Sequence, residues 1–214
     1  MSDFSPELQP KEKTEEQPAK PGWRGFLQET LETVGLAIIL FLVINILSAR
    51  VRVDGFSMRP TLNDGEFVLV SRVANFVGGY HRGDIIVFRP PMYPPESSLR
   101  LFLGLPNYSD QYEDYIKRVI GLPGEEVQIK DGQVFINGFP LLEPYIAAPP
   151  DYSGDWTVPA GELFVLGDNR NNSHDSHAWG FLPIKNVLGK ALFVYWPFSE
   201  WTVLHASEAV LTAH

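Results

Sequence analysis

The chain has 214 residues, of which 44% are hydrophobic and 13% aromatic, which is enough for one globular domain with a packed core. Its net charge of −9 excludes the broad positive field that attracts a nucleic-acid backbone, so nucleic acid is not expected as a partner. Because the sequence contains no cysteine, it excludes disulfides, thiolate metal clusters and a cysteine nucleophile.

Two segments precede the globular domain. Residues 1–22 carry four prolines, many Glu and Lys, and almost no large apolar side chains, which predicts a disordered tail. Residues 23–50 are predicted as an interfacial segment followed by a helical membrane anchor. The uncharged centre of this anchor, Thr33–Ala49, has seventeen residues. As a helix it covers about 25 Å, near the short end of what crosses a bilayer.

Two other interpretations of this apolar segment are weaker. A buried core helix is apolar on one stripe, whereas this segment is apolar all round. A cleaved signal peptide needs small residues at positions −3 and −1 of the cut, but Leu47 precedes Ala49, and Ile46 precedes Ser48. The charged residues on the two sides of the segment do not resolve its orientation.

The rest of the chain has the pattern of a β protein. Short runs rich in Val, Ile and Phe, separated by turn pairs, predict a mostly β domain of antiparallel, twisted sheets over residues 51–205, with a C-terminal tail at 206–214. Asp-Gly at 131–132 and Asn-Gly at 137–138 predict a three-strand meander through residues 127–142. Further strands are predicted at 66–72, 84–89, 115–120, 162–166 and 190–196.

Two stretches inside this domain lack a strand pattern. Residues 90–114 contain five prolines and are predicted as a long loop, which in a compact domain is either mobile or functional. Residues 147–156, "AAPPDYSGDW", are predicted as a second irregular connection.

The stretch "YIKRVIGLPG", residues 115–124, places two cations inside an apolar strand. Strand alternation puts Lys117 on one face and Arg118 on the other. One interpretation is an edge strand whose cations reach water along their own methylenes. The other is a lysine held in an apolar pocket, where desolvation lowers its pKa and makes it a general base.

A base of this kind needs a nucleophile. The stretch "VDGFSMRPTLNDGE", residues 53–66, offers Ser57 between Gly55 and Pro60. Pro60 fixes its own φ and Gly55 permits a tight backbone, so Ser57 is expected on a rigid turn. An ordinary turn serine fits the same local sequence.

A third polar stretch is "GDNRNNSHDSHAWG", residues 167–180. It is either a surface loop of Asx turns or a segment that Trp179 draws against the core. In the second case its polar side chains must satisfy one another: Asp168, Asn169, Arg170, Ser173 and Asp175. A metal site at His174, Asp175 and His177 is disfavoured, because the two histidines share a face only if this Asn-rich segment is helical.

Taken together, "SMRPTL" after an apolar N-terminal segment, "YIKRVIGLPG" about sixty residues later, and "GDNRNNSHDSHAWGFLP" near the end closely resemble the type I signal peptidases, the bacterial leader peptidases. The resemblance covers residues from about 33 to 200. It implies a signal-peptidase-like antiparallel β-sheet catalytic domain, with a smaller β region at about 121–160.

The resemblance also implies roles for individual residues. Ser57 corresponds to the nucleophile and Lys117 to the general base, with Ser173 orienting the lysine amine. Charge pairing among Arg118, Asp168, Arg170 and Asp175 is expected to hold the site together. In that arrangement Arg118 meets a carboxylate, Asp175, while Lys117 has no counter-ion. Met58 is expected to line the substrate groove.

Two positions depart from the family pattern. Some members have a serine two residues before the nucleophile that stabilises the oxyanion, whereas this chain has Gly55. The N–H of Ser57 must then carry that task. Where many members have Arg, this chain has His177, and its pairing with Asp175 weakens as histidine loses its proton above about pH 6.5.

The function expected from these observations is a membrane-anchored serine endopeptidase that removes signal peptides from exported preproteins. It needs no metal and no cofactor, its partners are preproteins and the lipid bilayer, and its catalytic domain lies on the exported side of the membrane. Two alternatives stay open: a Ser/His/Asp hydrolase that uses His174 or His177, and a membrane-tethered β domain that binds exported proteins without catalysis.

Overall fold

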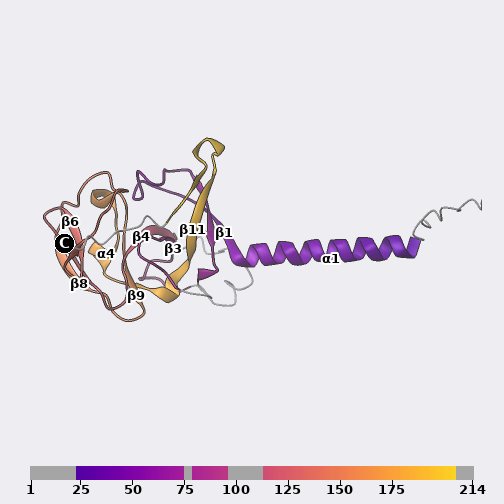
Figure 1. Cartoon of the computed structure of the whole chain (residues 1–214), viewed down its shortest axis with the longest axis horizontal. Helices are drawn as coiled ribbons and strands as arrows, with labels where there is room; N and C mark the ends of the chain where they lie inside the picture. Colours follow the sequence, from indigo (N-terminus) through magenta and orange to yellow (C-terminus); the bar gives the residue numbers. More distant parts are fainter. Residues whose placement is uncertain (1–22, 75–78, 96–112, 206–214) are drawn as a thin grey trace, which may run out of the picture. The chain divides into compact units, whose positions relative to one another are not determined.

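The computed structural model describes residues 23–74, 79–95 and 113–205 (Figure 1). The tails expected at 1–22 and 206–214 lie outside these residues, as does most of the long loop expected at 90–114. The chain divides into two compact units, Met1–Phe41 and Leu42–His214.

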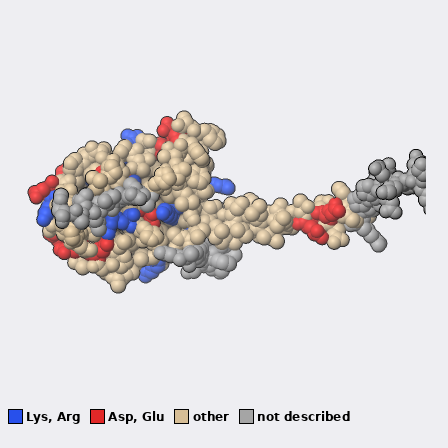
Figure 2. All heavy atoms as spheres, viewed as in Figure 1, with Lys and Arg blue, Asp and Glu red and all other residues tan. Residues whose placement is uncertain are grey.

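A single long helix begins the described chain. Helix α1 runs from Trp23 to Leu47. Its residues 25–47 form a segment that is long and apolar enough to cross a membrane, and the apolar part of this segment is not buried. Seven consecutive apolar residues, 38–44, are exposed, and consecutive positions turn through the whole circumference of a helix. Figure 2 shows acidic atoms near the N-terminal end of α1 and no charged atoms along the rest. The helix therefore has the surface of a bilayer helix rather than of a core helix.

The larger sheet contains eight strands, and every strand pair in it is antiparallel. Its order is β1-β2-β11-β3-β4-β9-β10, with β12 paired to β11. The strands are β1 (Ser48–Arg52), β2 (Phe67–Ser71), β3 (Ile85–Phe88), β4 (Tyr115–Gly121), β9 (Glu162–Leu166), β10 (Leu182–Pro183), β11 (Val187–Trp196) and β12 (Thr202–Val203). The predicted mostly β, antiparallel fold is thus confirmed.

A second sheet of four antiparallel strands has the order β7-β6-β5-β8. The strands are β5 (Glu126–Lys130), β6 (Gln133–Ile136), β7 (Phe139–Pro140) and β8 (Gly154–Thr157). The predicted meander is β5 to β7. Both of its turns have positive φ at their two central residues, 51° and 74° at Asp131-Gly132 and 51° and 82° at Asn137-Gly138, as tight hairpins require. Figure 1 shows β6 and β8 at the end of the domain away from β1.

Short helices complete the described chain: η1 (Arg170–Asn172), α4 (Ser176–Trp179), η2 (Ile184–Asn186) and η3 (Phe198–Glu200). Helix α4 has Asp175 as its N-cap, whose side chain accepts from the N–H of His177. The predicted packing of Trp179 is confirmed, because this side chain packs against the buried cluster that includes Phe88.

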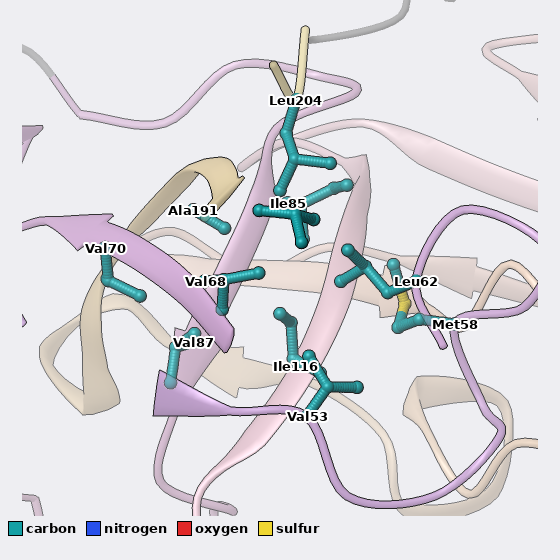
Figure 3. Close-up of a cluster of buried hydrophobic side chains, with 11 residues drawn as sticks. Val53, Met58, Leu62, Val68, Val70, Ile85, Val87, Ile116, Ala191 and Leu204 are labelled. Atoms are coloured by element: carbon teal, nitrogen blue, oxygen red, sulfur yellow. The ribbon is translucent and has the colours of Figure 1, made fainter. Parts of the chain in front are cut away.

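Three clusters of buried apolar side chains fill the domain. Figure 3 shows the first, in which Met58 and Leu62 pack beside residues of β2, β3 and β11. Strand β4 contributes to all three, with Ile116 in the first, Ile120 in the second and Val119 in the third. It is therefore buried on both faces and anchors the segment that carries Lys117 and Arg118.

Candidate active site

Strand β4 is a central strand, so the edge-strand interpretation of its two cations is wrong. It lies between β3 and β9, and Lys117 and Arg118 are opposite Ile86 and Ile85 of β3. The exposed fractions are 4% for Lys117 and 1% for Arg118. Neither side chain reaches bulk water, so each charge must be paired, hydrogen-bonded or neutralised inside the protein.

The Lys117 amine lies against the Ser57 hydroxyl. Ser57 belongs to the connection between β1 and β2, and its Oγ lies 2.7 Å from Lys117 Nζ, a hydrogen-bond distance. Nζ also donates to the carbonyl of Ile116 at 3.0 Å. Sixty residues separate the serine and the lysine in the sequence, so this contact is made by the fold of the sheet.

Burial lowers the pKa of Lys117 from its ordinary value of 10.5 to about 8, because an ammonium loses its hydration in this site. The negative charges of Asp175 and Asp168 act in the opposite direction and raise it, but by less. Since neither carboxylate forms an ion pair with Lys117 in the described part of the chain, a substantial neutral fraction exists at mildly alkaline pH.

Arg118 is paired with Asp168, not with Asp175 as expected from the sequence. Its Nε donates to Asp168 Oδ1 at 2.8 Å and its Nη2 to Oδ2 at 2.6 Å, a two-point contact that matches both planar groups. Thr61 also donates to Asp168, at 2.5 Å. The two acids whose charges raise the pKa of Lys117 thus have other partners: Asp168 pairs with Arg118, and Asp175 contacts His177.

The turn at 167–169 holds the backbone of Ser57. The N–H of Asn169 donates to the Ser57 carbonyl at 3.0 Å, and its side-chain amide donates to the carbonyl of Phe56 at 3.1 Å. Gly167 lies so close that an added Cβ would collide with the Ser57 carbonyl oxygen and with Ser173 Oγ. Ser173 Oγ is buried but has no hydrogen-bond partner among the described residues. Its orienting role toward Lys117 therefore stays a prediction.

Asp175 holds a different part of the site. Its Oδ2 accepts from the N–H of Gly167 at 2.8 Å, and its Oδ1 lies 2.7 Å from His177 Nδ1. The ring of His177 is stacked on Tyr152, with 4.0 Å between the ring centroids. His177 thus occupies the position of a structural partner of Asp175, and no hydrogen bond joins it to Ser57 in the described residues.

Arg170 is held by a segment that the sequence analysis did not single out, which contains Glu143 and Tyr145. Its guanidinium donates to both oxygens of Glu143, at 2.8 and 2.5 Å, and its Nε donates to the Gly167 carbonyl at 3.1 Å. Tyr145 Oη donates to Glu143 at 2.8 Å, and the Tyr145 ring lies 4.0 Å from the Arg118 guanidinium carbon. A buried arginine is expected to pair with a carboxylate, but no local sequence pattern identifies a partner that is 27 residues away.

A cleft of about 950 Å³ opens beside Ser57 and Lys117. Strand β1, the Asp54–Ser57 segment, the start of β4 and His174 contribute to its lining. Met58 does not line it: this side chain is 1% exposed and packs in the cluster of Figure 3. The expectation that Met58 lines the groove is therefore corrected: Met58 lies in a turn where the N–H of Leu62 donates to its carbonyl, and both side chains pack into the core.

Gly55 has a φ of 97°, a value that suits glycine, and its N–H donates to the Asp64 side chain at 2.7 Å. The position that carries a serine in some relatives of the resembled family therefore contributes no hydroxyl here. Within the described ranges no group of three or more His, Cys, Asp or Glu side chains is arranged to hold a metal ion. The chemistry available in the cleft is thus that of a hydroxyl beside a buried amine.

Comparisons with known proteins give consistent matches. A family model described as signal peptidase, peptidase S26, matches residues 27–196. Signal peptidase I of Leptolyngbya laminosa is 43% identical over 176 residues, which cover 81% of this chain and 82% of that protein. Signal peptidase I of Bacillus amyloliquefaciens is 34% identical over 203 residues, covering 89% and 95%. A crystal structure of a signal peptidase I from Enterococcus faecalis V583 matches with 31% identity and a TM-score of 0.42, covering 53% of this chain and 97% of that chain.

Proposed function

The chain belongs to the signal peptidase family, peptidase S26, and on this premise we propose that Ser57 is its nucleophile and Lys117 its general base. As a member it is a serine peptidase that removes signal peptides, and a non-catalytic binding domain is thereby excluded. The observation that carries the proposal is the 2.7 Å separation of Lys117 Nζ and Ser57 Oγ beside the cleft.

In the first half of the reaction, neutral Lys117 takes the proton of the Ser57 hydroxyl as Oγ attacks the scissile carbonyl carbon. The new Oγ–C bond turns the carbonyl oxygen into an oxyanion. When the C–N bond breaks, the Lys117 ammonium returns its proton to the leaving amine. The products are an acyl-enzyme on Ser57, a released mature N-terminus and a neutral lysine.

In the second half, Lys117 takes a proton from water, which adds to the acyl carbon and displaces Ser57 Oγ. The proton then returns to Oγ, and the signal peptide leaves with a new carboxylate. Since Gly55 offers no hydroxyl, the backbone N–H of Ser57 is the proposed donor to the oxyanion. A single donor of this kind is typically worth about 10²–10³ in rate.

The proposed substrates are exported preproteins with small side chains at −3 and −1 of the cut. Helix α1 is proposed to anchor the enzyme in the bilayer that holds the apolar signal segment, with the catalytic domain on the exported side. Anchoring both partners in one membrane raises their effective concentration. No metal or cofactor takes part in the proposed steps.

The test uses the full chain in liposomes with a preprotein substrate. Ser57→Ala is expected to abolish cleavage, because it removes the hydroxyl that is proposed to attack the scissile carbonyl. Lys117→Met is expected to reduce the rate by at least the ~10²–10⁴ that general-base catalysis contributes. A serine-directed acylating reagent is expected to label the wild type and to leave Lys117→Met unlabelled.

The rival Ser/His/Asp hydrolase predicts different losses. It requires that His174→Ala or His177→Ala abolish acylation of the serine, and that activity follow a histidine titration near pH 6.5. The Lys117 base instead predicts activity that rises as pH increases through about 8, where the neutral amine becomes dominant. Normal cleavage by either Ser57→Ala or Lys117→Met would falsify the proposal.

A further inference from the structure

A segment outside the three sequence motifs contacts the site. Glu143 lies in the connection between β7 and β8, and its side chain is 4% exposed. Both of its oxygens accept from Arg170, and Oε1 also accepts from Tyr145 Oη at 2.8 Å. Burial and the negative charge of Glu143 raise the pKa of the Tyr145 hydroxyl, which keeps its proton for this bond. A two-point contact of this kind fixes the orientation of a guanidinium as well as its position.

Arg170 transmits this constraint to the turn beside the nucleophile. Its Nε donates to the carbonyl of Gly167, where an added Cβ would collide with the Ser57 carbonyl oxygen. Two residues later, the N–H of Asn169 donates to that same oxygen. Displacement of the Arg170 side chain would therefore shift the turn that holds Ser57.

The same segment touches the second buried arginine. The ring of Tyr145 lies 4.0 Å from the Arg118 guanidinium carbon and 6.0 Å from that of Arg170. Arg118 in turn binds Asp168, the residue between Gly167 and Asn169. The turn is thus held from both sides by arginines that contact residues 143–145.

We propose that Glu143 is a positioning residue for signal-peptide cleavage, which acts through Arg170 to hold the 167–169 turn and so the Ser57 hydroxyl in the geometry of attack. This inference rests on the proposed roles of Ser57 and Lys117. In this proposal the four-stranded sheet contributes to catalysis, because the connection between its strands β7 and β8 carries Glu143 and so helps to position the nucleophile.

The experiment compares Glu143→Gln with the wild-type full chain, by steady-state cleavage of a preprotein in liposomes. The amide keeps the shape of the carboxyl group but turns a donor toward Arg170, so the two-point contact is lost. We expect kcat to fall on the order of 10- to 100-fold, as for an ångström-scale misplacement of a reacting group, with KM little changed.

The matched control is Glu125→Gln. Glu125 pairs with Arg82 at 2.7 Å, and both side chains are largely buried. Among the described residues, no hydrogen bond or ion pair joins this pair to the 167–169 turn. A merely structural loss lowers the melting temperature and leaves kcat per folded molecule at the wild-type value, which is the result expected for this control. Circular dichroism measures the folded fraction of each variant.

Two further variants keep the inference open to refutation. If Glu143→Gln does not fold, Tyr145→Phe removes one hydrogen bond to Glu143 and keeps the ring, and it is expected to lower kcat several-fold in the same assay. In an Arg170→Gln background, Glu143→Gln is expected to cause no additional loss of kcat, because its effect passes through Arg170.

Wild-type kcat per folded molecule in Glu143→Gln, or in Tyr145→Phe where the first variant does not fold, overturns the inference. A full additional loss in the Arg170→Gln background overturns it as well. Failure of the underlying catalytic proposal has a separate signature, since Ser57→Ala would then retain activity whatever the result at Glu143.

Discussion

At residue 117, two physical effects oppose each other within one side chain. Burial removes the hydration that stabilises an ammonium, while Asp175 and Asp168 supply negative potential that favours it. Burial is the larger effect, because each acid is held by another partner, Arg118 for Asp168 and His177 for Asp175. The outcome is an amine with a pKa of about 8, close to the pH at which a general base works best.

This arrangement has a cost in stability that Lys117→Met reveals. Because the pKa of Lys117 is lower in the fold than in the unfolded chain, the unfolded chain binds more protons between pH 8 and 10.5. Lys117 therefore destabilises the fold most below pH 8, and this destabilisation disappears as pH rises toward 10.5. Lys117→Met is expected to raise the unfolding free energy by about 3 kcal/mol at pH 7 and by much less at pH 10.5.

Thermal unfolding of the full chain in detergent, followed by circular dichroism at both pH values, measures this difference. Arg52→Met is a suitable control, because its side chain is 58% exposed and its removal should change the melting temperature little at either pH. A Lys117→Met melting temperature at or below that of the wild type at pH 7 would contradict the account of Lys117 as a destabilised ammonium.

Sequence patterns identified the two residues that are proposed to react but not all of the residues that hold them. Ser57 and Lys117 stand in motifs with a chemical reason of their own, namely a rigid turn and a cation inside an apolar strand. Glu143 has no such local signal, because its partner Arg170 is 27 residues away and only the fold brings them together. The pairing of Arg118 with Asp168 depends in the same way on the register of β4 and β9.

At the scale of elements, patterns with strong local chemistry were predicted and elements formed by pairing were not. Strands β2, β3, β4, β9 and β11 follow apolar runs, and the Asx-Gly turns fix the β5–β7 meander. Strand β1 was missed because "SARVR" is polar and follows an apolar helix directly. Strand β8 was missed because Gly154 and Asp155 are turn residues, and it forms through its pairing with β5.

The two hairpin turns of the small sheet predict a graded response to substitution. Gly132→Ala and Gly138→Ala both place a side chain at positive φ, which costs roughly 1 kcal/mol or more of unfolding free energy. Only at Gly132 does the added Cβ also approach a neighbour closely, Pro149 at 3.0 Å, whereas the space around Gly138 is open among the described residues. Gly132→Ala is therefore expected to be the more destabilising of the two.

Thermal unfolding of both variants provides the comparison, and cleavage per folded molecule should remain at the wild-type value in each. Equal melting temperatures for the two would show that the contact with Pro149 adds nothing to the backbone strain.

At the scale of the whole molecule, an apolar helix and a β domain are combined in one chain. Over residues 38–44, helix α1 is apolar all round, and this surface suits lipid better than water. As the proposed membrane anchor of an enzyme whose substrates bear apolar signal segments, the helix would confine the search for substrate to the membrane. Its contribution should therefore depend on whether the substrate is itself bound to the membrane.

The variant Leu40→Arg/Phe41→Arg tests this role. Two arginines near the middle of the helix disfavour insertion by roughly 5 to 7 kcal/mol, so the protein should lose its membrane association. Cleavage of a preprotein in liposomes is expected to fall, while hydrolysis of a short soluble peptide remains unchanged. Leu40→Ala/Phe41→Ala, which adds no charge, should retain both activities. Equal losses on the two substrates would contradict a role limited to anchoring.

The most direct test of the central claim is a titration of the Lys117 amine itself. NMR of the full chain in detergent, with lysine labelled at 13Cε and the Lys117 signal assigned by its absence from Lys117→Met, follows the proton on this side chain as pH changes. The expected midpoint for Lys117 is near pH 8, because its buried ammonium has lost hydration. A midpoint at the ordinary lysine value of about 10.5 would contradict the proposed role of Lys117 as a general base.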